Sequence, residues 1–284
     1  MEANDNIDKT SCLSLLITSA LLLVAAAYWH RHVIRKRNRA RWDGIGKDIV
    51  VLHCSTPGYF SPSLSPFVFK LMNYLRLAKI PYKLDHEEIF GPKGKTPWIT
   101  LNGEDISDSQ LVIETLAKKF DKNFSRDLSP EQQAVARAFT IMLDEHLAWG
   151  LRYWRYKLDK GRSMQEAMKI PFYMLLMKPF FLRSQQDALW QQGMGRHTPT
   201  EVEEVTIKDL AALSHYLGTN PYLMGNSLCE VDCSMFAFVA NILCNYKKSP
   251  YYSVVKDNYS NLYDYVQRVK AQLWPDWDEC LESK

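Results

Sequence analysis

The chain has 284 residues, enough for one or two domains, and hydrophobic residues make up 46% of it, so it is not intrinsically disordered. Its 35 Lys and Arg residues nearly balance 32 Asp and Glu residues, and a net charge of +3 does not predict a nucleic-acid partner. The six Cys residues show no C-x-x-C pair, so we expect neither a disulfide framework nor a metal site.

An uncharged segment near the N-terminus is the first distinctive feature. Residues 11–29 carry no charged side chain, and a helix of this length extends about 28 Å, close to the hydrocarbon thickness of a bilayer. A leader with three acidic side chains, residues 1–10, precedes the segment, and a basic linker, residues 30–47, follows it. This layout predicts a single transmembrane helix with the folded domains facing the cytosol.

Two alternatives stay open for this region. Residues 25–27 are all alanine and would suit a signal peptidase, although a signal peptide carries its basic residues before the apolar region. The basic linker is either a solvated flank or a contact to anionic lipid headgroups. The sequence therefore predicts a membrane protein and leaves open whether the membrane is the mitochondrial outer membrane or the endoplasmic reticulum.

The next residues predict an α/β unit, which we assign to residues 48–121. Short β-branched or apolar runs predict strands at 48–54, 80–85 and 98–101, and Asn102-Gly103 predicts a tight turn into a fourth strand. Helices are expected from Ser65-Pro66 to Lys79 and over residues 108–120. The order β-α-β, then β-β-α, is typical of a thioredoxin-like domain.

The second unit, residues 129–277, is predicted to be entirely helical. Ser129 starts a long amphipathic helix that reaches residue 156, and two more helices cover residues 201–217 and 230–245. The apolar segment 169–183 is divided by two prolines and three basic residues into pieces too short to cross a bilayer. It is either a buried helix or a patch that rests on a bilayer surface.

Four ordered motifs carry a resemblance to a known family. They are SPSLSPFVFKLMNYLRLAKIPY, GPKGKTPWITLNGEDISDSQLVIETL, GMGRH and YLMGNSLCEVDCSMFAF. From about residue 49 to residue 277 the chain resembles the failed axon connections family, a metaxin-related branch of the glutathione transferase superfamily. The resemblance implies the glutathione transferase fold, which is a thioredoxin-like N-terminal domain followed by an all-α C-terminal domain.

The resemblance leaves two functions open. One is a membrane-anchored scaffold with a vestigial or weak glutathione site that binds a protein or lipid partner, as metaxins do at mitochondria. The other is a membrane-tethered transferase that conjugates glutathione to small electrophiles. Ser65 favours the scaffold, because it stands where the cysteine-using transferases have their nucleophile and cannot form a mixed disulfide.

The resemblance also implies which residues would bind glutathione. Thr96 and Pro97 match the motif that holds a cis proline, where the preceding backbone pairs with the glutathione peptide. Asp108 and Ser109 match the acidic residue and the serine that receive the γ-glutamyl amine and carboxylate at a helix start. The Ser65 hydroxyl would donate a hydrogen bond to the glutathione thiolate, the only catalytic role expected here.

Each of these residues also has a structural interpretation. Ser65 would be an N-cap worth about 1 kcal/mol, and Ser107 with Gln110 would form a capping box at the second helix. Tyr59, in the loop after the first strand, is a second candidate partner for the thiol. In the helical unit, Asp232 is expected to be structural, because it matches a buried capping element of the superfamily in which Cys229 replaces the usual Ser or Thr.

An aromatic cluster on the long helix also has two interpretations. Its members are Trp149, Arg152, Tyr153, Trp154, Arg155 and Tyr156. In the fold that the resemblance implies, this helix lines the substrate cleft, where an Arg would meet a carboxylate. Packing against a neighbouring helix is the simpler interpretation and the one that we favour.

Overall fold

The structure is a computed structural model that describes residues 2–42 and 44–283. Within them, four strands form one sheet in the order β2-β1-β3-β4. The strands are β1 (Val50–His53), β2 (Tyr82–Asp85), β3 (Trp98–Leu101) and β4 (Glu104–Ser107). β1 and β2 are parallel, whereas β1 with β3 and β3 with β4 are antiparallel. The predicted thioredoxin-like sheet is confirmed.

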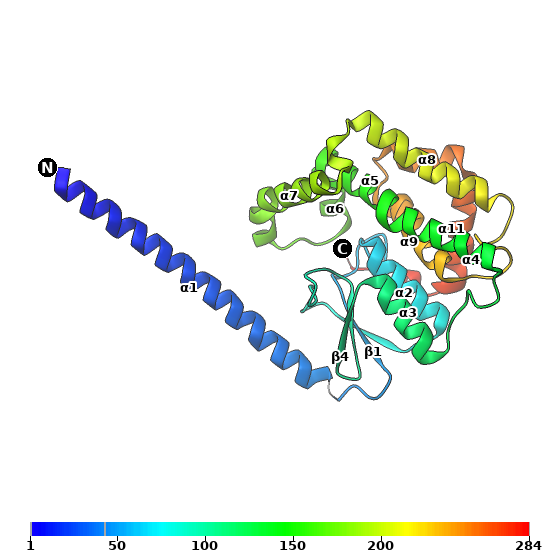
Figure 1. The fold of residues 1–284 in the computed structure, drawn as a ribbon, viewed down its shortest axis with the longest axis horizontal. Helices are drawn as coiled ribbons and strands as arrows, with labels where there is room; N and C mark the ends of the chain where they lie inside the picture. The colour runs from blue at the N-terminus through cyan, green and yellow to red at the C-terminus, as the bar shows by residue number, and fades with distance from the viewer. Residues whose placement is uncertain (1, 43, 284) are drawn as a thin grey trace.

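The two faces of this sheet differ in chemistry because successive side chains in a strand point to opposite sides. Val50 and Leu52 of β1 belong to an apolar core with α2 (Pro66–Ala78) and α3 (Ser109–Phe120), which lie together beside the sheet in Figure 1. His53 of β1 is buried and stacks on Trp98 of β3, with ring centroids 3.6 Å apart. One face therefore joins the apolar core and the other carries polar groups.

The rest of the chain beyond residue 129 is helical, as predicted. Its elements are α4 (Pro130–Met142), η1 (Leu143–Leu147), α5 (Ala148–Tyr153), η2 (Trp154–Leu158), α6 (Arg162–Ala167), α7 (Phe172–Gln192), η3 (Met194–Arg196), α8 (Pro199–Leu217), α9 (Glu230–Asn245), α10 (Pro250–Ser253), η4 (Val254–Asn258), α11 (Ser260–Leu273) and η5 (Trp277–Cys280). The predicted long helix is continuous from α4 to η2, but it contains two π-helical segments, η1 and η2. The exact residue limits that we assigned to the two domains stay a prediction.

Packing of α2 against α9 joins the two units into one core. Phe69 of α2 contacts Phe236 of α9, with ring centroids 5.3 Å apart. The Asn73 side chain, fully buried on α2, donates to the Cys233 carbonyl at 3.0 Å. Because buried amides need partners, this bond fixes the register of the two helices as well as the apolar contacts do.

Asp232 has the structural role that the sequence predicts. Its carboxylate is fully buried and accepts the backbone N–H of Leu223 at 2.9 Å, the backbone N–H of Cys229 at 3.0 Å and the Tyr265 hydroxyl at 3.0 Å. The Cys229 thiol donates to the same carboxylate at 3.3 Å. Asp232 therefore supplies the capping interaction at the start of α9, and Cys229 is accommodated beside it.

Helix α1 (Glu2–Trp42) extends away from the two domains in Figure 1. Among the residues that the structure describes, no helix combines the length and the apolar character that crossing a bilayer requires. The expected transmembrane helix at residues 11–29 is therefore not supported, and within it the side chains at positions 11–13, 16 and 20 lie outside the description. The segment is helical, and Leu21 to Val24 are all exposed.

The basic linker is partly docked on the folded body. Arg35 pairs with Asp105 of β4 at 3.3 Å and lies 3.8 Å from Glu88, and Arg41 lies 3.7 Å from Glu87. Most of these side chains remain partly exposed, so each pair contributes little to stability. The simple picture of a solvated flank is thus wrong for these two arginines.

The segment 169–183 is not a buried helix. Its residues lie mostly in α7, and Phe172, Leu176 and Phe180 are among its exposed side chains. The alternative of a surface patch is the one that agrees with the structure.

The C-terminal end of the chain is held on α2 by an ion pair. Arg76 donates to both carboxylate oxygens of Asp276, at 2.6 and 2.9 Å, and its guanidinium lies 3.7 Å from the ring centroid of Trp274. The hydrogen bond from Arg76 lowers the pKa of Asp276 to about 2.

This shift predicts a pH-dependent contribution to stability. Because the pKa of Asp276 is lower in the folded state than the ordinary value of about 3.9, its contribution is complete above about pH 4 and is lost as the pH falls to about 2. Asp276→Asn should lower the free energy of unfolding by about 1 kcal/mol at pH 5 and change it little at pH 2, a modest effect because the carboxylate is partly exposed. Urea unfolding at several pH values measures this, with the exposed Asp264→Asn as control. An equal loss at both pH values would contradict it.

Candidate functional site

Ser65 acts as the N-cap of α2. Its hydroxyl accepts the Val68 N–H at 3.4 Å, and its own N–H donates to the Ser63 hydroxyl at 3.2 Å. The buried Arg155 donates to the neighbouring Leu64 carbonyl at 3.0 Å and so fixes the loop that leads into the helix. The capping interpretation of Ser65 is confirmed, and its side chain is half-buried. Any contact between this hydroxyl and a thiol would be additional to the cap.

The loop between β1 and α2 is anchored to the helical domain. The Tyr59 N–H donates to the Ala167 carbonyl at 2.7 Å, at the end of α6. Its half-buried ring meets the ring of Phe60 edge to face. Tyr59 is therefore held by its backbone near α6, and its role as a thiol partner stays a prediction.

The Thr96–Pro97 peptide bond is cis, and Pro97 is buried. It lies directly before β3, and the Thr96 hydroxyl reaches the His53 carbonyl at the end of β1 at 3.5 Å. The loop therefore lies beside the end of β1, and the polypeptide passes from it straight into the central part of the sheet.

The start of α3 differs from the predicted capping box. Asp108 is the N-cap residue, with a φ of 87°, and its carboxylate accepts the N–H groups of Gln110 at 3.0 Å and Leu111 at 3.2 Å. The Gln110 side chain instead donates to Glu114, and the Ser107 hydroxyl is buried without a partner among the described atoms. The Ser107–Gln110 box is therefore wrong, because Asp108 binds both N–H groups itself.

Ser109 follows as the first residue of α3 and is buried. At this position a side chain lies at the positive end of the helix dipole, whereas the N–H groups of Gln110 and Leu111 are already bonded to Asp108. An anionic group brought to this point would meet Ser109 and the helix N-terminus together.

A buried ion pair lies between the domains at the same site. Lys70 of α2, fully buried, donates to Asp144 of η1 with an Nζ to Oδ2 distance of 2.6 Å. The second oxygen of Asp144 is buried and has no hydrogen-bond partner among the described atoms. Burial raises the pKa of Asp144, Lys70 opposes this, and the nearby Glu145 and Asp108 carboxylates raise it further. Asp144 therefore interacts electrostatically with Asp108, the residue that caps the start of α3.

Sequence reasoning missed this pair. Asp144, Glu145 and His146 are adjacent in the sequence, and such a run predicts no shared chemistry because neighbouring helical residues point in different directions. The structure agrees, since the His146 side chain is hydrogen-bonded to Asp209, with an Nδ1 to Oδ2 distance of 2.6 Å. The signal that could have identified Lys70 is its own position, a charged residue on the otherwise apolar face of a helix.

The aromatic cluster is mainly packing. Tyr153 and Trp154 are buried, and the Trp154 ring meets Tyr246 edge to face with centroids 5.5 Å apart. The Arg155 guanidinium lies 4.5 Å from the centroid of the Tyr246 ring, and Arg152 donates to Gln185 at 2.9 Å. These contacts confirm the favoured interpretation for these four residues.

A polar network occupies the other face of the sheet. His53 is hydrogen-bonded through Nδ1 to Asp85 at 2.7 Å and through Nε2 to Thr100 at 3.0 Å, and Thr100 donates to Asp105 at 2.9 Å. Burial raises the pKa of Asp85, but the hydrogen bond and charge interaction with His53, together with the backbone N–H groups of Glu87 and Glu88, outweigh it and leave the pKa below its ordinary value. Arg35 of α1 donates a hydrogen bond to Asp105 and is the last member of this network. The network therefore connects the sheet to α1.

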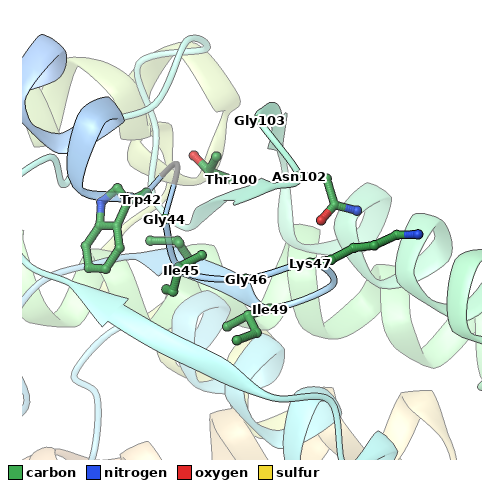
Figure 2. Close-up of a pocket in the computed structure, with 10 residues that line it drawn as sticks. Trp42, Gly44, Ile45, Gly46, Lys47, Ile49, Thr100, Asn102 and Gly103 are labelled. Carbon is green, nitrogen blue, oxygen red and sulfur yellow. The ribbon is translucent and has the colours of Figure 1, made fainter.

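A pocket of about 440 Å³ lies where α1 meets this face. Figure 2 shows Trp42 at one end and Lys47 and Asn102 at the other. The Trp42 indole nitrogen is buried without a hydrogen-bond partner among the described atoms. None of the residues expected to bind glutathione lines this pocket, so it is separate from the site at α3.

Metal ligands do not gather anywhere in the described part of the chain, where no group of three or more His, Cys, Asp or Glu side chains is placed to hold an ion.

Two family models match the chain. The glutathione S-transferase N-terminal domain matches residues 66–161, and the glutathione S-transferase C-terminal domain matches residues 206–269. Among solved structures, a glutathione S-transferase from Methylobacterium radiotolerans in complex with glutathione sulfonate aligns with a TM-score of 0.55 and 14% identity, covering 79% of this chain and 91% of that one. At this identity the likeness shows the fold.

Several curated proteins are similar in sequence. Failed axon connections from Drosophila melanogaster is 33% identical over 82% of this chain and 60% of its own length. Isoprene-epoxide–glutathione S-transferase from a Rhodococcus species is 29% identical, covering 79% of this chain and 99% of that one. Mouse Metaxin-2 is 24% identical over 72% of this chain and 80% of its length. The chain thus spans about three fifths of the Drosophila protein.

The buried ion pair between the domains provides a test of the site geometry. Lys70→Met should lower the free energy of unfolding by about 3–5 kcal/mol, because it leaves the Asp144 carboxylate buried and unpaired. Adding Asp144→Leu should restore most of that loss, since both charges are then removed. Urea unfolding of both variants measures this, with the exposed Lys208→Met as control. If the double variant were as unstable as Lys70→Met, the pair would not be the cause.

Proposed function

Because the chain belongs to the glutathione-transferase-like family that includes Failed axon connections and the metaxins, we propose that it is a membrane-attached scaffold with a weak glutathione site. The finer parts of this proposal are the ligand, the absence of efficient turnover and the attachment to a membrane. Each is supported by a different part of the structure.

The start of α3 is the observation that carries the ligand assignment. Ser109 is buried at the first position of the helix, where its hydroxyl and the positive end of the helix dipole would receive the γ-glutamyl carboxylate of glutathione. Two carboxylates, Asp108 and Asp144, interact electrostatically nearby and would attract its ammonium group. The buried oxygen of Asp144 without a partner fits a ligand donor. The donor set of this site therefore suits glutathione.

The remaining site residues would hold the rest of the ligand. The backbone at Thr96, before the cis Pro97, would pair with the peptide part of glutathione. Bound in this way, glutathione would supply a thiol near the start of α2. The Ser65 hydroxyl would contact that thiol in addition to accepting the hydrogen bond from the Val68 N–H.

The scaffold is favoured over the enzyme because of Ser65. A hydroxyl that already serves as an N-cap gives less stabilisation to a thiolate, and serine cannot replace cysteine as a redox nucleophile. The second candidate function, a transferase acting on small electrophiles, has one observation in its favour. It is the similarity to isoprene-epoxide–glutathione S-transferase over nearly that whole protein.

Glutathione binding should depend on Ser109 more than on Ser65. Charge-assisted bonds at the helix start contribute about 1.5–3 kcal/mol each, whereas one hydroxyl facing a thiol contributes about 1 kcal/mol. Ser109→Ala should therefore weaken binding about tenfold or more, and Ser65→Ala should leave it nearly unchanged. Calorimetry with the wild type and both variants measures this, with unfolding curves to show that each variant is folded.

The same experiment separates the two functions. Weak binding with no turnover of a generic electrophile supports the scaffold, and turnover that falls in Ser65→Ala supports the transferase. If the folded wild type does not bind glutathione at millimolar concentration, the ligand assignment is wrong.

Membrane attachment is proposed through α1. Leu15, Ile17 and residues 21–24 of this helix are exposed apolar side chains that no part of the folded body covers. Burial of such surface in a bilayer is favourable by about 25 cal/mol per Å². The basic linker that follows supports a cytosolic location of the folded domains in this proposal.

Full-length protein should therefore stay with membranes after alkaline carbonate washing. Leu22→Lys with Val24→Lys should release it, because charges in a bilayer are costly. Fractionation followed by immunoblotting measures this, with Arg137→Lys, an exposed change in α4, as the matched control. Release of the wild type by carbonate would refute the attachment.

A further inference from the structure

The outer surface of α7 is apolar. Phe172, Leu176 and Phe180 are 74%, 63% and 71% exposed. Their four-residue spacing places them on one stripe of the helix. Met174 and Met177 are further exposed apolar side chains of the same helix. So much exposed apolar surface on a single helix indicates a contact with something that the chain itself does not supply.

The opposite side of α7 holds the helix on the domain. Leu189 is fully buried, and the Phe181 ring meets Tyr156 edge to face with centroids 5.3 Å apart. Lys178 donates to Gln165 at 2.9 Å on this side. These contacts attach α7 to the helical domain, and the side chains of the outer stripe do not pack into the folded core.

The charges around the stripe are mostly basic. Between Glu166 and Asp187 the charged residues are Lys169, Lys178 and Arg183, and Arg183 pairs with the exposed Asp187 at 3.2 Å. Lys169 and Arg183 are exposed near the two ends of the stripe. An apolar face with basic residues at its border is typical of a helix that lies in the interface of an anionic bilayer.

We propose that α7 docks on the surface of an anionic lipid bilayer. Phe172, Leu176 and Phe180 enter the boundary between headgroups and acyl chains, and Lys169 and Arg183 contact the headgroups. A second copy of the chain is the alternative occupant, which an effect of protein concentration would reveal. In Figure 1, α7 lies at the edge of the helical domain on the side toward which α1 extends.

This docking goes beyond the proposed function, because it requires neither glutathione binding nor attachment through α1. If α1 also holds the protein on a membrane, docking of α7 fixes how the folded domains are oriented on it. The side of the body that carries α7 would then face the lipid.

Hydrogen exchange of the full-length protein tests the docking. The protein is mixed with vesicles of phosphatidylcholine alone or with about 30% phosphatidylserine, which gives the surface its negative charge. Peptides from residues 172–183 should exchange about threefold more slowly with the anionic vesicles, since lipid covers the helix and suppresses its opening. Phosphatidylcholine alone should have little effect.

Two variants complete the test. Leu176→Glu with Phe180→Glu should abolish the protection, whereas Tyr263→Glu, at an exposed position of α11, should not. Unchanged exchange of residues 172–183 with anionic vesicles would overturn the proposal. So would protection without vesicles that increases with protein concentration, which would indicate a second copy. Because α1 peptides are followed in the same experiment, protection of α1 alone would refute docking of α7 and leave the attachment through α1 intact.

Discussion

Packing of α2 against α9 is the contact on which the rest of this structure depends. Helix α2 lies between the sheet and the helical domain, so its buried residues belong to both halves of one core. The Asn73 side chain fixes the register of this contact, and Asp232 caps the start of α9. Loss of that contact would separate the two units and expose the apolar surface of each.

The same packing places charged groups where they are costly. Lys70 lies on the side of α2 that faces the helical domain, where it forms a buried ion pair with Asp144 of η1. A buried pair of this kind contributes little net stability, since removal from water offsets the attraction. The second carboxylate oxygen of Asp144, buried without a partner among the described atoms, is part of the case for the proposed ligand site.

The surface carries two further features that the core does not require. Polar contacts join His53, Asp105 and Arg35 across the polar face of the sheet and hold the base of α1. Helix α7 presents an apolar stripe with a basic border. Both features bear on the proposed attachment and docking to a membrane, and neither depends on the proposed glutathione site.

The sequence by itself determined the fold and most of the local structure, because these depend on short-range patterns. Alternating and helical periodicities located the strands and helices, Ser65-Pro66 and Ser129-Pro130 marked helix starts, and the resemblance to the superfamily implied the capping role of Asp232. Only the tertiary structure decided which distant groups meet. Lys70 and Asp144 are 74 residues apart in the chain. The choice of Asp108 over Ser107 as the cap depended on a backbone angle, a φ of 87°, that composition does not encode. The exposure of α7 was likewise undecidable from its apolar residues, since burial depends on what the rest of the chain packs against them.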